Sequence, residues 1–386
     1  MMNPLCALRP SLLSKISLLF ALSLPFLSSC KGLRFNEEDS YGLRLVTLDI
    51  TPEEYGLLNG QLLSKRPAQV EIRVAGEFKV FCSANYAGRS SLDAYRKSYD
   101  LNFCEQKYNK RSSYRLSAQF IDKTLARSLI GYEIFKKMGL EVPKAELATA
   151  YINRKYQGVY LFMETVDNEF YKSHQISTRE LYKAQYGNAS FRTDWASRLS
   201  EAFDYDGRGE DNFTYLQEIY KLLYNEPQPE VFAQKLDSFF DTESFLSYMA
   251  VALSMNHWDG FDNNYYLAFD TDKKKLITTP WDLDRIWEKP NEYTPDNLLI
   301  RNEVLARLLK VESYHKNFVQ KVAQINAEYP PEKLVELVKT YEAQAKKAYS
   351  EDPILSRYQA TAYVELEENI VIWDAKVKEY LSRNPL

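Results

Sequence analysis

The chain has 386 residues, of which 45% are hydrophobic, so it can bury one large core or two lobes. Its 53 acidic and 49 basic residues give a formal net charge of −4, and it has no long basic run, which disfavours nucleic acid as the main partner. Two of its four Cys lie in the first thirty residues, and the other two cannot build a zinc motif with three scattered His.

The first thirty residues have the pattern of an export signal. Arg9 and Lys15 precede the apolar run "ISLLFALSLPFL", about twelve residues that are too few to span a bilayer as a mature helix. The run ends in Leu27-Ser28-Ser29-Cys30, which resembles a bacterial lipobox, although an ordinary signal peptide with a chance Cys is the alternative. We therefore predict a lipoprotein signal peptide over residues 1–29 and a lipidated Cys30. The protein would then be exported and anchored to a bacterial membrane by acyl chains.

The front half of the chain alternates apolar and polar residues, which is typical of strands. The runs "LRLVTLDI" and "QVEIRVAGEFKVFC" alternate, and Ala75-Gly76-Glu77 would turn the second run into a hairpin. The run "KSYDLNF", which begins at Lys97, and the pair "ELATAYIN" and "GVYLFMETV" are further strands. Between them the spacing predicts a helix that Asp122 caps and Gly139 ends.

Cys82 and Cys104 fall in two neighbouring predicted strands, "KVFC" and "YDLNFC". Export would place them in a compartment where disulfides persist. We therefore predict that these two Cys form a disulfide.

The second half of the chain has a polar stretch followed by a mostly helical one. Residues 166–240 are polar with weak helical pieces, and the loop "DYDGRGEDN" invites a calcium interpretation. An EF-hand that starts at Asp204 would need Glu where Tyr215 stands, so a solvated loop is predicted instead. After residue 240 the chain is mostly helical, beginning with a helix that Asp241 caps. Further amphipathic helices are predicted in "DNLLIRNEVLARLLK", after Tyr314, after Pro331 and through Trp373.

One stretch, "MNHWDGFDNNYYLAFDTDKKKLITTPWDLD" over residues 255–284, is unusually rich in Asp. A loop, "HWDGFDNN", precedes a strand pair, "YYLAFD" and "KLITTPW", so Asp259, Asn264 and Asp282 would meet at one end of a hairpin. Trp258 and Trp281 each precede an Asp, and we expect both indoles to pack as core beside the acids. A solvated loop followed by a turn is the alternative.

Protein kinases use the same order of helix, acidic loop, hairpin and second acid. Their catalytic-loop Asp receives the hydroxyl proton and stands five residues before a metal-binding Asn, as Asp259 stands before Asn264. Mg²⁺ prefers such hard oxygen ligands. A kinase also needs a cation on the nucleotide phosphates, and Lys97 is the candidate. No G-x-G-x-x-G precedes Lys97, and an exposed strand-edge charge is the alternative there.

These segments resemble the CotH spore-coat kinases, distant relatives of the secretory-pathway kinases. The resemblance covers about residues 85–285 and rests on "GRSS" followed by "RKSYDLNF", on "DKTLARSLIGYEIFKKMGL", on "YINRKYQGVYLFMETVD" and on "DNNYYLAFD…TTPWDLD". The sequence departs from the family in Gly88-Arg89, where the family usually has Arg-Gly.

The resemblance implies an α+β fold of the atypical two-lobe protein-kinase type. A β-rich N-lobe over about residues 43–165 and a mostly helical C-lobe over about 166–386 would follow a linker over 30–42.

The resemblance also implies ATP and Mg²⁺ or Mn²⁺ as cofactors, and a set of site residues. Asp282 and Asp284 are both nominated for the metal, and Asp262 could replace Asp259 if the loop is shifted. The implied residues are Asp259 as the catalytic acid, Lys97 and Glu164 at the nucleotide, and Asn264, Asp282 and Asp284 at the metal.

Three functional hypotheses follow. The first is a lipid-anchored, metal-dependent kinase that phosphorylates Ser or Thr of a secreted or surface protein. The second is a catalytically inactive kinase-like scaffold or binding lipoprotein at the cell surface or spore coat, whose acids hold Ca²⁺ or a glycan. The third is a hydrolase with Asp259 and Asp282 as paired carboxylates. Lys97 together with the acidic loop favours the first hypothesis, because a scaffold needs none of these residues in concert.

Overall fold

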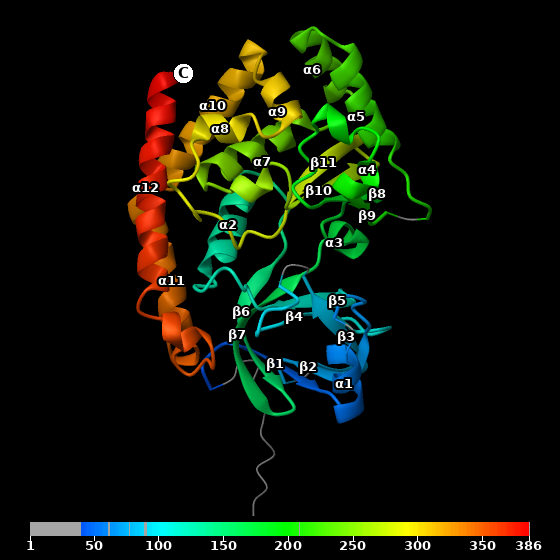
Figure 1. Cartoon of the computed structure of the whole chain (residues 1–386), viewed down its shortest axis with the longest axis vertical. Coiled ribbons are helices and arrows are strands. Elements are labelled where there is room, and N and C mark those ends of the chain that lie inside the picture. Colours follow the sequence, from blue (N-terminus) through cyan, green and yellow to red (C-terminus); the bar gives the residue numbers. More distant parts are fainter. Residues whose placement is uncertain (1–39, 61, 77, 89–90, 208, 386) are drawn as a thin grey trace, which may run out of the picture. The chain divides into compact units, whose positions relative to one another are not determined.

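The computed structural model describes residues 40–385 except 61, 77, 89–90 and 208. The predicted signal peptide, Cys30 and part of the "GRSS" loop lie outside the described residues. The described chain has a β-rich N-terminal part and a mostly helical C-terminal part, which is the mixed α+β class predicted (Figure 1).

The N-terminal strands close into a barrel in the order β1-β2-β3-β4-β5-β7-β6. β1 runs parallel to β6, and the other neighbours are antiparallel. Because side chains alternate across each strand, one face of every strand contributes to a single apolar core inside the barrel. The elements are β1 (Arg44–Asp49), α1 (Pro52–Gly60), β2 (Ala68–Val74), β3 (Phe78–Ala87), β4 (Ser98–Asn102), β5 (Ser113–Ser117), β6 (Ala145–Ile152) and β7 (Lys155–Glu164).

A disulfide joins Cys82 to Cys104, with their Cα atoms 5.8 Å apart. Cys82 lies on β3 as expected, whereas Cys104 lies just beyond the end of β4 and has a positive φ of 55°. The bond therefore ties β3 to the turn that follows β4.

The helix predicted between the strands is α2 (Ala126–Lys137), and its start differs in detail from the prediction. Leu125 is the N-cap residue and makes no side-chain capping bond. Asp122 lies further upstream, and its carboxylate accepts the backbone N–H of Arg127 at 3.0 Å. Asp122 thus satisfies an N-terminal N–H of α2 without occupying the cap position.

A second, antiparallel sheet in the C-terminal part has the order β11-β10-β8-β9. The hairpin of β10 and β11 was predicted, whereas β8 and β9 lie in the stretch expected to be polar with weak helical pieces. β8 was missed because its buried Glu180 interrupts the apolar pattern; this carboxylate accepts hydrogen bonds from Arg179 and Asn212. The strands are β8 (Thr178–Ala184), β9 (Phe203–Tyr205), β10 (Tyr265–Asp270) and β11 (Lys275–Pro280).

The buried helix α7 (Thr242–Ser254) begins at the predicted cap, Asp241, whose side chain accepts the N–H of Ser244. The run "DNLLIRNEVLARLLK" forms two short helices instead of one, because Asn302 caps the second by accepting the N–H of Leu305. No helix in the described part of the chain is long and apolar enough to cross a membrane. The remaining helices are α3 (Asn168–Ser173), α4 (Leu199–Ala202), α5 (Thr214–Asn225), α6 (Pro229–Asp237), α8 (Pro295–Leu299), α9 (Glu303–Leu308), α10 (Glu312–Glu328), α11 (Pro331–Ser350) and α12 (Ala362–Arg383).

Asp352, which follows α11, joins the C-terminal part to the barrel. Its buried carboxylate pairs with buried Arg96 at 3.0 Å and accepts the N–H of Val159 on β7 at 2.8 Å. Gly158 has a φ of 109°, and a Cβ there would lie 2.0 Å from Asp352 Oδ2. Only glycine therefore permits this close approach.

Glu169 on α3 makes a second link to the barrel. Its carboxylate accepts the N–H and the hydroxyl of Ser112, both at 2.7 Å, and pairs with Lys107 at 2.6 Å. Burial raises the pKa of Glu169, but the bonds from Lys107 and Ser112 outweigh it and lower this pKa from 4.5 to about 2.

We predict that Glu169 stabilises the fold at neutral pH and that this contribution is lost in acid. Because its folded-state pKa lies below 4.5, the contribution is complete above that pH and falls as the pH drops toward 2. The side chain is 30% exposed. After allowance for solvent screening, Glu169→Gln should cost about 1–2 kcal/mol at pH 7 and clearly less at pH 3. Urea unfolding of both proteins at pH 7, 5 and 3 measures this. An equal loss at every pH would contradict the prediction.

Candidate functional site

A cavity of about 500 Å³ lies between the outer face of the barrel and the acidic hairpin. Ser98, Arg115 and Ser117 line it from β4 and β5. On the other side its lining is acidic and comes from the segments before β10 and after β11: Asp259, Asn263, Asn264, Asp282 and Asp284.

The structure brings Asp259, Asn264 and Asp282 together. Asp259 lies on a short 3₁₀ turn, and its Oδ2 accepts the Asn264 amide N–H at 2.9 Å. The same amide nitrogen donates to the backbone carbonyl of Asp282 at 3.3 Å. Asn264 and Asp282 both have positive φ values, of 53°, which is uncommon outside glycine and clusters at functional sites. Asn264 therefore fixes the distance between the acidic loop and the end of the hairpin.

Nearby cations only partly neutralise the carboxylates of this cluster. Burial and the nearby Asp282 raise the pKa of Asp259, and Arg285 only partly offsets them. The pKa of Asp284 is raised well above its ordinary value by burial and by the charge of Asp282. Like charges at close range favour protonation or a bound cation.

Two cations line the cavity, Arg115 from the barrel and Lys183 from β8, the strand that pairs with β10. Arg115 on β5 makes two bonds to Asp100, at 2.7 and 3.1 Å, which hold its guanidinium plane. Its Cζ lies 5.1 Å from the ring centroid of Trp281, and Lys183 Nζ on β8 lies 5.9 Å from the same centroid. Burial and the neighbouring Arg115 lower the pKa of Lys183. Neither cation was predicted from the sequence.

The two indoles, of Trp258 and Trp281, differ in burial and in the rings that they contact. Trp281 is buried as expected and meets the ring of Tyr266 edge-on at 5.8 Å. Trp258 is only half-buried and stacks on Tyr293 at 5.3 Å, with the Arg285 guanidinium 5.5 Å from its ring. Trp281 therefore lies beside Arg115 and Lys183, whereas Trp258 lies against Tyr293 and Arg285.

Lys97 does not line this cavity. It immediately precedes β4, and strand alternation directs the next residue, Ser98, toward the cavity and Lys97 away from it. Lys97 Nζ instead bonds to the carbonyl of Leu92 and lies 5.8 Å from the ring of Tyr86. The structure offers Arg115 and Lys183 at the place where Lys97 was expected.

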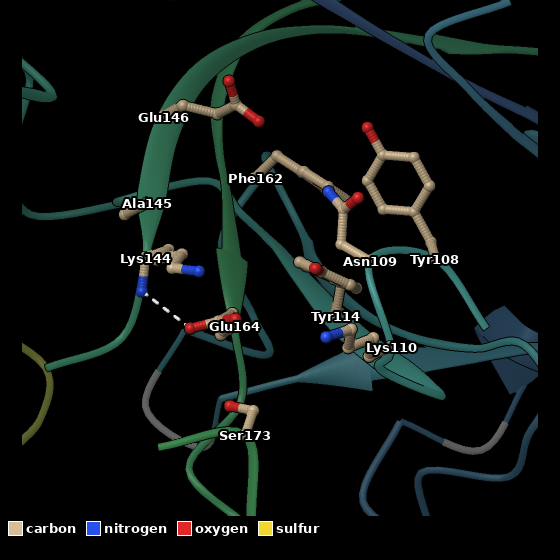
Figure 2. Close-up of a pocket in the computed structure, with 10 residues that line it drawn as sticks. All are labelled: Tyr108, Asn109, Lys110, Tyr114, Lys144, Ala145, Glu146, Phe162, Glu164 and Ser173. Carbon is tan, nitrogen blue, oxygen red and sulfur yellow. Dashed lines mark hydrogen bonds between the residues drawn. The ribbon is translucent and has the colours of Figure 1, made fainter. Parts of the chain in front are cut away.

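Glu164 also lies away from the acids. It pairs with Tyr114 across β5 and β7, while the next pair, Arg115 with Met163, faces the opposite way. Glu164 therefore lines a separate cavity at the end of the barrel, where its Oε2 accepts the N–H of Lys144 at 3.0 Å (Figure 2).

Asp262, the alternative to Asp259, is buried and does not line the acidic cavity. Its Oδ2 pairs with Arg301 at 2.6 Å. Burial raises the pKa of Asp262 to about 6, against the lowering effect of Arg301. Its geometry suits a structural ion pair, so Asp259 is the acid of this loop that faces the cavity.

The comparisons with known proteins give the family. The model of the CotH kinase protein family matches residues 84–380. The chain belongs to the CotH kinase family. It is 25% identical over 289 residues to inner spore coat protein H of Bacillus subtilis (strain 168), over 72% of this chain and 79% of that protein.

Two solved structures are similar to this CotH family member over most of its length, at 12% identity each. One is HipA of Shewanella oneidensis MR-1, solved with HipB and operator DNA, with a TM-score of 0.37 over 76% of this chain and 69% of that one. The other is the Helicobacter pylori proinflammatory kinase CtkA, with a TM-score of 0.34 over 73% and 94%.

A kinase family implies ATP and a divalent metal, and the donor set at the acidic hairpin fits such a metal. In the described part of the chain no three His, Cys, Asp or Glu side chains gather into a metal-binding group. Mg²⁺ does not require one, because it commonly binds through one or two carboxylates and completes its shell with water and substrate phosphates. Asp282 and Asp284 would supply the carboxylates, and the Asn264 amide oxygen would supply a neutral ligand.

The acidic loop depends on a tight contact at Gly260. His257 beneath it is fully buried, its ring nitrogens lack partners among the described residues, and burial lowers its pKa to about 3. A Cβ at Gly260 would lie 2.1 Å from His257 Cδ2. The neutral imidazole thus packs directly against Gly260, the residue that follows Asp259, and leaves no room there for a side chain.

We predict that Gly260→Ala destabilises the protein by about 1–3 kcal/mol, the usual cost of overpacking, and weakens ligand binding at Asp259. The control is Gly56→Ala on α1, where a Cβ meets nothing within 4 Å. That change should be neutral or stabilise by up to about 1 kcal/mol. Thermal and urea unfolding of both variants give the comparison. Equal stabilities would show that the loop yields to the added methyl group.

Proposed function

We propose that this CotH family member transfers the γ-phosphoryl group of ATP to a Ser or Thr hydroxyl of a secreted or surface protein, with Mg²⁺ or Mn²⁺. The observation that supports this most directly is a single cavity lined by both acids and cations. Asp259, Asp282 and Asp284 line it together with Arg115, Lys183 and Arg285. A metal–triphosphate complex carries charge of both signs and complements such a cavity.

Each residue then has a separate task. Asp259 accepts the proton of the substrate hydroxyl as its oxygen bonds to the γ-phosphorus and the bond from that phosphorus to the ADP oxygen breaks. Asn264 holds Asp259 through the bond to Oδ2. Arg115 and Lys183 bind phosphate oxygens in place of the expected Lys97. A divalent metal held by Asp282 and Asp284 would neutralise part of the negative charge of the triphosphate.

A catalytically inactive scaffold is the second candidate. It is favoured by one observation, that Lys97 points away from the acidic cavity. In that case the cavity would hold a metal or a nucleotide without turnover. The two candidates differ in phosphoryl transfer and agree in ligand binding, so transfer must be measured separately.

We predict that Asp259→Asn and Asp282→Ala fail in different ways. Asp259→Asn should keep ATP·Mn²⁺ affinity within about twofold of wild type and slow transfer by about 10²–10⁴-fold, the usual contribution of a general base. Asp282→Ala should weaken metal-dependent ATP binding by at least about tenfold as well. The measurements are calorimetric titration with ATP and Mn²⁺, and transfer of radiolabel from [γ-³²P]ATP to cell-surface protein.

The matched control is Asp272→Asn, an exposed acid in the turn of the same hairpin, which should change neither binding nor transfer. Asp262→Asn should lower stability without altering ATP affinity, because its partner is Arg301. Equal loss of binding in Asp259→Asn and Asp282→Ala would make the acids a shared chelate. ATP binding by the wild type without any transfer would favour the scaffold.

We propose further that the protein is exported and anchored through acyl chains on Cys30. The support is the sequence pattern of residues 1–30, and thirteen residues lie between Cys30 and the start of β1 at Arg44. A protein substrate at the same membrane face would then be within reach of the anchored enzyme.

The expected outcome for Cys30→Ala is release from the membrane fraction and loss of an acyl-labelled N-terminus. Cell fractionation with metabolic labelling by a fatty-acid analogue tests this, and Cys6→Ala, inside the predicted signal peptide, is the control that should stay anchored. A wild-type protein that is entirely soluble and unlabelled would refute the anchor.

A further inference from the structure

A second cavity, of about 520 Å³, lies at the end of the barrel and takes no part in the proposed phosphoryl transfer. It is separated from the acidic cavity by the β5–β7 pair, because Tyr114 and Glu164 face one side and Arg115 faces the other. Figure 2 shows its lining, which comes from the turn before β5, from β5, from the start of β6, from β7 and from the end of α3.

One wall of this cavity is aromatic. The rings of Tyr114 and Phe162 stack at 4.5 Å with an angle of 9° between their planes. Tyr108 meets both rings edge-on, at 5.7 and 6.0 Å. Tyr114 and Phe162 belong to the barrel core and Tyr108 packs against it, so the wall is preformed and offers an apolar surface to a ligand.

The charged groups around this wall are not mutually neutralised. Glu164 is only 3% exposed, and among its contacts is the N–H of Lys144. Within the described residues, Lys110 and Lys144 form no ion pair, although both line the cavity with Glu164 (Figure 2). Glu146, by contrast, is already paired with Arg44 through two bonds, at 2.9 and 3.1 Å. Two ammonium groups and one buried carboxylate therefore face a common hollow.

We propose that this cavity binds a small zwitterion, an amino acid or short peptide with an apolar side chain. Its carboxylate meets Lys110 and Lys144, its amino group meets Glu164, and its apolar side chain lies against the aromatic wall. This class matches the three features together. A neutral ligand would leave Lys110, Lys144 and Glu164 without ionic partners. A polyanion such as ATP would be repelled by the buried carboxylate of Glu164.

The probe is the dipeptide Ala-Phe, titrated calorimetrically into the full chain. Two blocked forms, N-acetyl-Ala-Phe and Ala-Phe-amide, each remove one charge and should bind at least about tenfold more weakly, the loss expected for one charge-assisted bond. Unfolding of each variant without ligand establishes that it is folded. Saturable binding of all three peptides with equal affinity, or of none, would overturn the proposal.

The variants assign each charge to its partner. Glu164→Gln should weaken Ala-Phe but leave N-acetyl-Ala-Phe unchanged, because that peptide has no ammonium group to lose. Lys110→Met should weaken Ala-Phe and leave Ala-Phe-amide unchanged. The controls are Glu105→Gln and Lys155→Met, two exposed residues outside the cavity, which should bind Ala-Phe normally.

The same titrations separate this site from the nucleotide site. Glu164→Gln should retain the ATP·Mn²⁺ affinity of the wild type, and ATP should not compete with Ala-Phe. Loss of ATP binding in Glu164→Gln, or competition between the two ligands, would overturn the proposal and place Glu164 at the nucleotide.

Discussion

The register in which β5 pairs with β7 determines what each cavity contains. With Tyr114 opposite Glu164 and Arg115 opposite Met163, one face of the pair belongs to the barrel and the other to the acidic cavity. A shift of one residue would exchange the two sets, since side chains alternate with a period of two. The same alternation divides the apolar residues, because Phe162 packs in the barrel core and Met163 packs in the core of the helical part.

The acidic cavity brings several carboxylates close together and holds them in fixed positions. Burial and the charge of Asp282 raise the pKa values of Asp259 and Asp284, and an arrangement of this kind costs folding free energy. Contacts from neighbouring residues hold the acidic loop in place despite this cost in folding free energy. Asn264 bonds the acidic loop to the hairpin, buried His257 packs against Gly260, and Trp281 packs against Arg115. Phosphoryl transfer requires such fixed charges, since catalysis of this reaction is chiefly positioning and electrostatics.

Sequence reasoning succeeded where one local pattern decides the outcome. Alternation identified the barrel hairpins, Asp241 marked the start of α7, and the order of helix, loop and hairpin brought Asp259 and Asn264 together. It failed where the outcome depends on which face of a strand meets the site. Lys97 and Ser98 are adjacent, and only the folded barrel shows that Ser98 faces the cavity. β8 escaped notice for a related reason, because tertiary partners satisfy its buried Glu180.

The ion pair between Arg96 and Asp352 bears on how the chain folds as it is synthesised. These residues stand 256 positions apart, and both are buried in the folded protein. Until Asp352 arrives, Arg96 is a cation without its counter-charge, and Val159 on β7 lacks its hydrogen-bond acceptor. The barrel therefore cannot reach its final packing until the segment that contains Asp352 has been synthesised. A fragment that ends before residue 352 would expose an unfinished barrel to chaperones and proteases.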